Sequence, residues 1–458
     1  MWEAINSFLT TVDNLVWGVP LMVLIMAGGI LLTARLGLLQ IRRLPLALKW
    51  MFKNEEEGDG EISSFAALCT ALSATIGTGN IVGVATAVCA GGPGALFWMI
   101  LAAFFGMATK YAEGVLAIKY RTKDKNGQIS GGPMYYILNG MGEKYKPLAV
   151  FFAFSGILVA LLGIGTFTQV NAITDAINGS FGIDPKLTGI ILAILVALVV
   201  FGGLQSISKV STKVVPFMSV AYILICLLIL GTSFKQIPQA FVLIIKSAFN
   251  PTAAFGGFLG ATVSMAIRNG IARGVFSNES GLGSAPIAAA AAKTEWPAEQ
   301  GLISMTGTFI DSLVICTLTG LSLILSGVWQ SDLNGAIMTQ AAFASIFPTI
   351  GPLFLTISLS LFAFTTILGW SYYGERCFEF LFGVKCINGY RATFVIMVLL
   401  GSFLKLEVVW IIADIVNGLM ALPNLIALIF LSSVVVAETK LYMNHLNKKE
   451  DIKETIEI

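Results

Sequence analysis

The sequence predicts an all-α integral membrane protein with eleven transmembrane helices, and three observations support this prediction. Of the 458 residues, 56% are hydrophobic and only 12% are charged, with a mean hydropathy of +0.84, whereas soluble domains carry about 25% charged residues. A search for apolar runs of about 20 residues, the length that crosses a bilayer, finds eleven candidate spans. The charged residues gather between these spans.

The eleven candidate spans also predict an orientation in the cell membrane. With the N-terminus outside, 21 of the 28 Lys and Arg residues fall in inner segments and four in outer ones. Because cytoplasmic loops are enriched in Lys and Arg, we expect the N-terminus outside and the C-terminus in the cytoplasm. The spans cover residues 13–34, 65–90, 94–117, 147–177, 187–204, 213–233, 253–276, 299–327, 350–374, 390–405 and 410–437.

The second span contains an interruption at residues 73–80. Gly77 and Gly79 flank Thr78 and precede Asn80, a composition that does not favour a continuous helix. A broken helix is tolerated in lipid only where its freed backbone groups face protein or a wet cavity, and such breaks form ion and substrate sites near mid-membrane. The same glycines also suit close packing between helices, so the segment alone leaves both interpretations open.

The seventh span has a similar run, with Arg268, Asn269, Gly270, Arg273 and Gly274. Charged and polar groups at this depth are costly in lipid and should face protein or a cavity. The two interrupted spans lie five spans apart, so two five-helix units would have opposite orientations. Inverted repeats that each begin with a broken helix are typical of secondary transporters. The predicted parts are an N-terminal span with an inner interfacial helix (1–63), the first repeat (64–233), the second repeat (253–437) and a cytoplasmic tail (438–458).

Four motifs resemble the alanine/glycine:cation symporter family. They are Gly77–Asn80, Gly91–Met99, Gly131–Tyr136 and Asn278–Pro286, and the resemblance covers nearly the whole chain. One departure is Ile100, where the family favours a second tryptophan. The resemblance implies a leucine-transporter-like fold with one extra span before a ten-span core. It also implies alanine and glycine as substrates, Na⁺ as the coupling ion, and no cofactor.

The resemblance further implies which residues bind the ligands. The backbone amides of Thr78 and Gly79 would meet the substrate carboxylate, and Asn80 with the carbonyl of Thr75 would belong to a second sodium site. The implied ligands of the first sodium site are the carbonyl oxygens of Ser73, Ile76 and Phe362 and the hydroxyls of Thr365 and Thr366.

Other substrate candidates come from their positions in the spans. Gln169 lies where the third core helix should pass the site, and an amide can bind either end of an amino acid. Trp370 follows Thr366 by four residues and shares its helix face. An interhelical hydrogen bond and a core tryptophan are equally good readings of these two residues. Asn269 and Gly270 are included from the second interruption.

Several charged residues lie inside or beside the spans. Asp311 and Arg268 should both be deep, where pairing would reduce their cost. With Asp414 they are candidates for a gate or a charge pair, and Asp311 is the best-placed carboxylate for proton coupling. Three other carboxylates, Glu113, Glu279 and Glu375, are expected near the inner surface in contact with solvent.

Composition and motifs weigh against other classes. A membrane-embedded enzyme would show a nucleophile motif or a metal cluster, but the chain has no HExxH, no GxSxG and no CxxC among its six cysteines, and only one histidine. A net charge of +2 gives no reason to expect nucleic-acid binding. A sodium-coupled symporter of small neutral amino acids is the leading hypothesis, with a proton-coupled transporter as the alternative.

Overall fold

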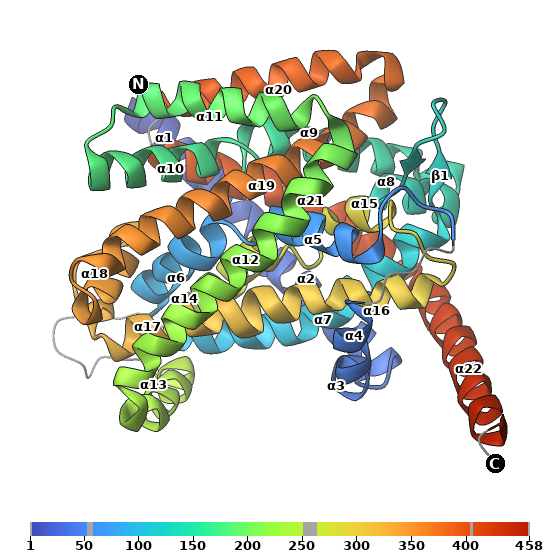
Figure 1. The fold of residues 1–458 in the computed structure, drawn as a ribbon, viewed down its shortest axis with the longest axis horizontal. Helices are drawn as coiled ribbons and strands as arrows, with labels where there is room; N and C mark the ends of the chain where they lie inside the picture. The colour runs from blue at the N-terminus through green and yellow to red at the C-terminus, as the bar shows by residue number, and fades with distance from the viewer. Residues whose placement is uncertain (1, 53–57, 251–262, 404–405, 457–458) are drawn as a thin grey trace.

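The computed structural model describes residues 2–52, 58–250, 263–403 and 406–456, and most of them lie in helices (Figure 1). The one hairpin within these ranges pairs β1 (Thr122–Lys123) with β2 (Ile129–Ser130). The α-helices are α1 (Trp2–Val16), α2 (Val19–Arg35), α3 (Leu39–Arg42), α4 (Leu44–Trp50), α5 (Ser64–Thr75), α6 (Val84–Gly91), α7 (Gly94–Lys119), α8 (Pro133–Tyr136), α9 (Lys146–Leu162), α10 (Phe167–Phe181), α11 (Pro185–Val200), α12 (Gly203–Thr232), α13 (Ile237–Phe249), α14 (Val263–Asn278), α15 (Ala285–Ala289), α16 (Pro297–Thr308), α17 (Thr317–Leu325), α18 (Gly335–Ile346), α19 (Ile350–Phe382), α20 (Ile387–Gly401), α21 (Leu406–Phe430) and α22 (Ser432–Ile456).

The helical, multi-span class is confirmed, whereas the count of eleven spans stays a prediction. Among the described residues, eight helical runs are long and apolar enough to cross a membrane, and a bent pair formed by α5 with residues 79–91 adds a ninth. α11 has 16 residues and falls short of a full span. Part of the predicted span 253–276 lies outside the described residues.

The predicted break in the second span is confirmed. α5 ends at Thr75, Ile76 is extended with ψ 92°, and a π-helical turn, η1 (Gly79–Gly83), leads into α6 after a bend of 52°. A Cβ atom on Gly77 would lie 2.4 Å from Thr366 Oγ1, and one on Gly79 would lie 2.8 Å from Ser277 Cα. These glycines therefore admit α19 and α14 against the broken backbone.

The second break lies further along the chain than the sequence indicated. α14 is continuous from Val263 to Asn278, so the prediction of an interruption at residues 268–274 is wrong. The chain breaks instead between α14 and α15, where Glu279, Gly281 and Gly283 have φ values of 56°, 87° and 84°. The left-handed backbone conformation of all three ends the helix.

Close packing explains the glycines that suggested the earlier position. A Cβ on Gly270 would lie 2.4 Å from the Ala95 carbonyl oxygen, and one on Gly274 would lie 3.2 Å from Met99 Cγ. Both glycines thus let α14 approach α7, which is the usual role of small residues between membrane helices.

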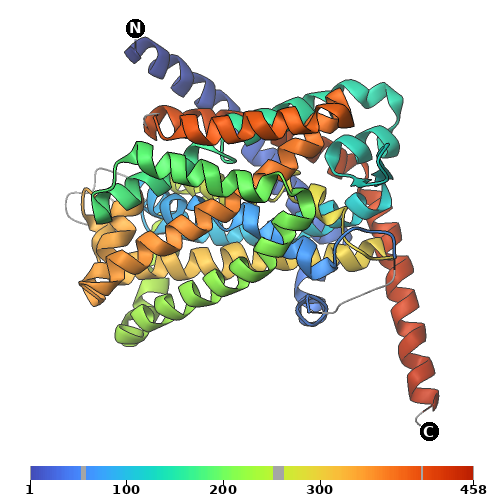
Figure 2. The same cartoon turned by 45° about the horizontal axis from the view of Figure 1, so that its top comes forward.

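The two broken helices pack together inside the bundle. α14 lies against η1, α6 and α7, while α19 lies against α5, α9 and α10. In Figure 1 the N-terminus and α18 lie on the left, and the β1–β2 hairpin, α8 and α22 lie on the right. Figure 2 shows α1 and α22 projecting from opposite ends of the molecule.

A strap joins the start of the first broken helix to the end of the second. Lys293 N–H donates to the Ile62 carbonyl at 2.8 Å, and Ile62 forms a parallel β-bridge with Ala292. The Arg121 guanidinium donates to the carbonyls of Ala290, Ala292 and Thr294 at 3.0, 2.7 and 3.0 Å. The start of α5 and the segment after α15 are therefore held together.

Candidate ligand and ion site

Three oxygen atoms converge where α19 crosses the end of α5. Thr366 Oγ1 lies 3.3 Å from the Ile76 carbonyl oxygen and 3.0 Å from the Phe362 carbonyl oxygen, and all three residues are buried. The hydroxyl has a single proton for these two acceptors. The surplus of acceptors, next to the negative end of a helix dipole, is a suitable environment for a cation.

The break frees one further oxygen beside this cluster. In an unbroken helix the Gly77 N–H would donate to the Ser73 carbonyl. Here it donates to Asn80 Oδ1 at 2.9 Å. The predicted Ser73 ligand thereby loses its expected helical partner, while the Ser73 hydroxyl donates to the Thr70 carbonyl at 2.7 Å.

Thr365, the other hydroxyl predicted for this site, faces less directly toward the cluster. Its Oγ1 donates to the Phe362 carbonyl at 3.0 Å and lies 3.7 Å from Met218 Sδ on α12. The Thr75 carbonyl stays a predicted ligand of the second sodium site, while the Thr75 hydroxyl lies 3.3 Å from the carbonyls of Ala71 and Leu72 in its own helix.

Gln169 of α10 reaches the broken segment with both ends of its amide. Its Oε1 accepts the Thr78 backbone N–H at 3.3 Å, and its Nε2 donates to Thr78 Oγ1 at 3.1 Å. The structure thus brings together Thr78 and Gln169, two predicted substrate residues. Gln169 Oε1 therefore accepts the hydrogen bond from the Thr78 amide that the resemblance assigned to the substrate carboxylate.

Asp311 lies beside the break in a π-helical segment, η5 (Phe309–Cys316). Its fully buried carboxylate accepts hydrogen bonds from Asn80 Nδ2 at 2.7 Å, Ser277 Oγ at 2.9 Å and Ser312 Oγ at 2.7 Å. No Lys or Arg of the described ranges forms an ion pair with it, so the predicted pairing with Arg268 is wrong.

The arginines of α14 face α1 and α21 instead. Arg268 donates to Asn14 Oδ1 at 2.5 Å and lies 4.0 Å from Asp13. Arg273 forms a two-point ion pair with Asp414, at 2.9 and 2.7 Å. Asp13 and Asp414 lie near the outer ends of their predicted spans. In the predicted orientation Arg273 therefore counts with the outer basic residues and not with the inner ones. Most Lys and Arg residues are still assigned to the inner side.

Two predicted substrate residues lie away from the break. Asn269 is partly exposed and donates to the Met265 carbonyl of its own helix at 2.9 Å, and Gly270 packs on Ala95. Ser277, about two helical turns later on α14, packs against Gly79 of the break. Sequence reasoning missed Ser277, although the motif Asn278–Pro286 begins at the next residue.

Trp370 forms a hydrogen bond that the sequence did not indicate. Its indole Nε1 donates to Glu279 Oε1 at 2.8 Å, and its ring meets Tyr373 edge-on with centroids 5.4 Å apart. Both Trp370 and Glu279 are buried. Trp370 therefore links α19 to the second break.

The expectation that Glu113, Glu279 and Glu375 contact solvent is wrong, since all three are buried. Glu113 Oε1 accepts from Asn424 Nδ2 at 2.7 Å. Glu375 is paired with Arg391 at 2.6 Å and with Arg376 at 2.8 Å. Glu113 and Glu279 have hydrogen-bond partners far away in the sequence, Asn424 and Trp370, so sequence position alone did not reveal their burial.

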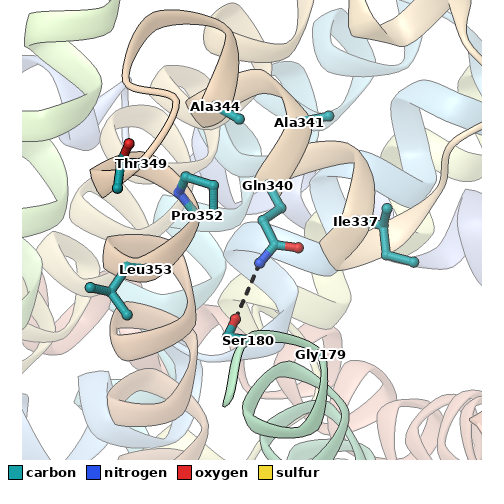
Figure 3. A pocket seen from close by; sticks show the side chains of 9 residues that line it. All are labelled: Gly179, Ser180, Ile337, Gln340, Ala341, Ala344, Thr349, Pro352 and Leu353. Carbon is teal, nitrogen blue, oxygen red and sulfur yellow. Dashed lines mark hydrogen bonds between the residues drawn. The ribbon is translucent and has the colours of Figure 1, made fainter. Parts of the chain in front are cut away.

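A cavity of about 510 Å³ lies between the end of α10, α18 and the start of α19 (Figure 3). Its lining is uncharged, and Gln340 Nε2 donates to Ser180 Oγ at 3.5 Å. Ser180 is eleven residues beyond Gln169 on α10, about 16 Å along the helix. The cavity is thus separate from the broken segment and lies toward the α18 end.

Comparisons with known proteins agree with this geometry. The sodium:alanine symporter family model matches residues 2–456. An uncharacterized transporter of Haemophilus influenzae is 56% identical over 98% of this chain and 100% of its own length. The sodium/alanine symporter AgcS of Methanococcus maripaludis is 53% identical over 97% of this chain and 98% of its own length. The crystal structure of MhsT in complex with L-phenylalanine has a TM-score of 0.57 at 14% identity, covering 84% of this chain and 99% of MhsT. The shared fold is that of leucine-transporter-like proteins.

Proposed function

Because this chain belongs to the sodium:alanine symporter family, we propose that it imports alanine and glycine together with Na⁺ by alternating access. The family and fold are those of secondary transporters and not of enzymes. Sodium-coupled amino-acid symport is the function that the family and the AgcS relative support. The specific substrates and the ion are our proposal.

The convergence of oxygens around Thr366 carries the sodium proposal. Sodium is a hard cation and prefers oxygen ligands. The carbonyls of Ile76 and Phe362, the Thr366 hydroxyl and the freed Ser73 carbonyl supply oxygens without a carboxylate. Thr365 would join them by rotating its hydroxyl.

The substrate would lie next to this ion, at the break in the second span. Its carboxylate would replace Gln169 Oε1 as the acceptor for the Thr78 amide and would meet the amide of Gly79. Trp370 lies one helical turn from Thr366 and would close the pocket around a small side chain. Asn269 and Gly270 are not part of this proposed pocket.

Asp311 supports a second cation in the same region. Its carboxylate is buried among neutral donors, beside Asn80 and Ser277, and an uncompensated buried charge is costly. A second Na⁺ bound with Asn80 and the Thr75 carbonyl would compensate it. A proton on Asp311 would do the same and is the basis of the alternative, proton-coupled mechanism.

The proposed orientation places the N-terminus outside and the C-terminus in the cytoplasm, with eleven spans and inverted repeats at residues 64–233 and 253–437. The opposite positions of α1 and α22 in Figure 2 are in line with termini on opposite sides of the membrane. The Arg273–Asp414 pair would then close the outer side of the site.

Uptake of labelled alanine into proteoliposomes tests the proposal. An inward sodium gradient at equal pH should drive accumulation, whereas an inward proton gradient without sodium should not. Accumulation that follows only the proton gradient would overturn sodium coupling. Failure of alanine and glycine to accumulate under either gradient would overturn the substrate assignment.

A further inference from the structure

The carboxylate of Glu279 is buried at the second break and forms no direct ion pair with a Lys or Arg of the described residues. Glu279 has no measurable exposure and a left-handed backbone, with φ 56°, which is strained for a residue with a side chain. Strained residues persist where the surrounding structure holds them, often at ligand sites.

Only neutral groups donate to this carboxylate in the described ranges. Trp370 Nε1 donates to Oε1 at 2.8 Å, and the Ser284 hydroxyl donates to Oε2. The ammonium of Lys110 donates to the Glu279 backbone carbonyl at 3.4 Å and acts on the carboxylate electrostatically, but it is not hydrogen-bonded to a carboxylate oxygen. A carboxylate offers about four acceptor sites, so roughly two remain for a cation.

The position of Glu279 relative to the proposed substrate site can be followed along α19. Thr366 and Gln169 lie at one level, where both approach Gly77. Trp370 lies one turn further along α19, about 6 Å from Thr366, and contacts Gly165 in the turn that precedes α10. Glu279 bonds to Trp370 at this second level. An amino acid whose carboxylate is bound at the first level would therefore have its ammonium group near the second level, on the side of Glu279.

We propose that the Glu279 carboxylate binds the ammonium group of the amino-acid substrate. The inference rests on the proposed function, since it places the substrate carboxylate at Thr78 and Gly79. Trp370 and Ser284 hold the carboxylate in place, and its charge selects ligands that carry a cationic amine. The substrate amine in turn supplies the direct cationic partner that this carboxylate lacks among the described residues.

Alanine and sodium binding to the purified full chain in lipid nanodiscs tests this role. Glu279→Gln keeps the size and an acceptor for Trp370 but removes the charge. Loss of a charge-assisted hydrogen bond should weaken alanine binding by about ten- to a hundredfold. The sodium affinity measured without alanine should change by less than about twofold, because the Thr366 cluster is intact.

Glu299→Gln is the matched control. Glu299 is a buried carboxylate on α16 that accepts from the Tyr442 hydroxyl at 3.1 Å, and its substitution should leave alanine affinity unchanged. If the Glu279→Gln protein does not fold, the Glu279→Asp protein can be measured instead. The shorter side chain keeps the charge but moves the carboxylate away from the substrate amine, so alanine binding should still be weaker.

Unchanged alanine affinity in a folded Glu279 variant would overturn the inference. An equal loss of sodium affinity without substrate would also overturn it, because Glu279 would then hold the coupling ion. In wild-type protein, propionate should fail to displace alanine where glycine succeeds, and equal displacement would exclude an ammonium site. Absence of sodium-driven alanine uptake in the wild type would instead count against the proposed function itself.

Discussion

The Thr366 hydroxyl lies 3.3 Å from the Ile76 carbonyl oxygen, across the contact between α19 and the broken end of α5. Thr366→Val keeps the shape of the side chain and removes this oxygen. The loss of one ligand should cost about 1–3 kcal/mol, so the sodium dependence of alanine binding should shift by about five- to a hundredfold to higher concentrations. Saturating sodium should restore most of the binding, because the substrate contacts remain.

Thr393→Val is the control for this substitution, since the Thr393 hydroxyl is exposed on α20 and donates to the Gly389 carbonyl at 3.0 Å. It should leave the sodium curve in place. A folded Thr365→Val, Thr366→Val protein with the wild-type sodium curve would exclude the proposed site.

The Arg273–Asp414 pair should slow the escape of alanine to the outside. The Arg273→Gln and Asp414→Asn proteins should each release bound alanine faster, and the double variant should release it no faster than either single variant. A coupling energy of about 1 kcal/mol or more is expected. Stopped-flow or filter-based dissociation measurements would give these rates.

Arg268→Gln is the comparison on the same helix. Arg268 is 38% exposed and lies 4.0 Å from Asp13. Exposed ion pairs contribute little to stability, so the Arg268→Gln protein should release alanine at the wild-type rate. Fully additive effects at positions 273 and 414 would argue against a gate.

Asp311→Asn distinguishes a second sodium ion from a proton. If Asp311 helps to bind a second Na⁺, the sodium dependence of alanine binding should change from sigmoidal to hyperbolic. Asp184→Asn, at an exposed position before α11, should keep the wild-type curve. A variant that retains the sigmoidal curve but loses a dependence of uptake on pH would identify Asp311 as a proton carrier.

Trp370 should restrict the size of the substrate. Leucine should not displace alanine at concentrations at which glycine does, and Trp370→Ala should admit larger side chains. Trp370→Phe keeps an aromatic wall but removes the donor to Glu279, so its selectivity should stay narrow. Competition binding measures each variant, and an unchanged selectivity in folded Trp370→Ala would assign Trp370 to the core.

Accessibility to an impermeant thiol reagent tests the orientation. In a background without the six native cysteines, Thr10→Cys should be labelled from outside intact cells. Asn126→Cys in the hairpin and Lys448→Cys in α22 should be labelled only after the membrane is opened. Labelling of position 448 from outside would overturn the proposed orientation.

The local composition of the sequence was enough to predict the first break. Gly77 and Gly79 mark the place where two helices approach the backbone, and Thr78, Gln169, Ile76 and Thr366 do come together. The break follows from residues that are close together in the sequence, whereas Ile76 and Thr366 were implied by the resemblance to the family.

The second break and the charge pairs could not be predicted in the same way. Arg268 and Arg273 suggested an interruption, but their partners Asp13 and Asp414 come from α1 and α21, far along the chain. Glycines of α14 that pack on α7 have the same sequence appearance as glycines that break a helix. The burial of Glu279 likewise depends on Trp370, 91 residues away.

The strap between Ile62 and Lys293 has a consequence for the transport cycle. It ties the beginning of one broken helix to the tail of the other, with Arg121 bridging the carbonyls beside it. In the proposed orientation α5 and α15 are the inner half-helices, and these contacts should make them move together. Departure of the ion and of the amino acid toward the cytoplasm would then share a single mechanical step, which leaves little opportunity for either to leak without the other.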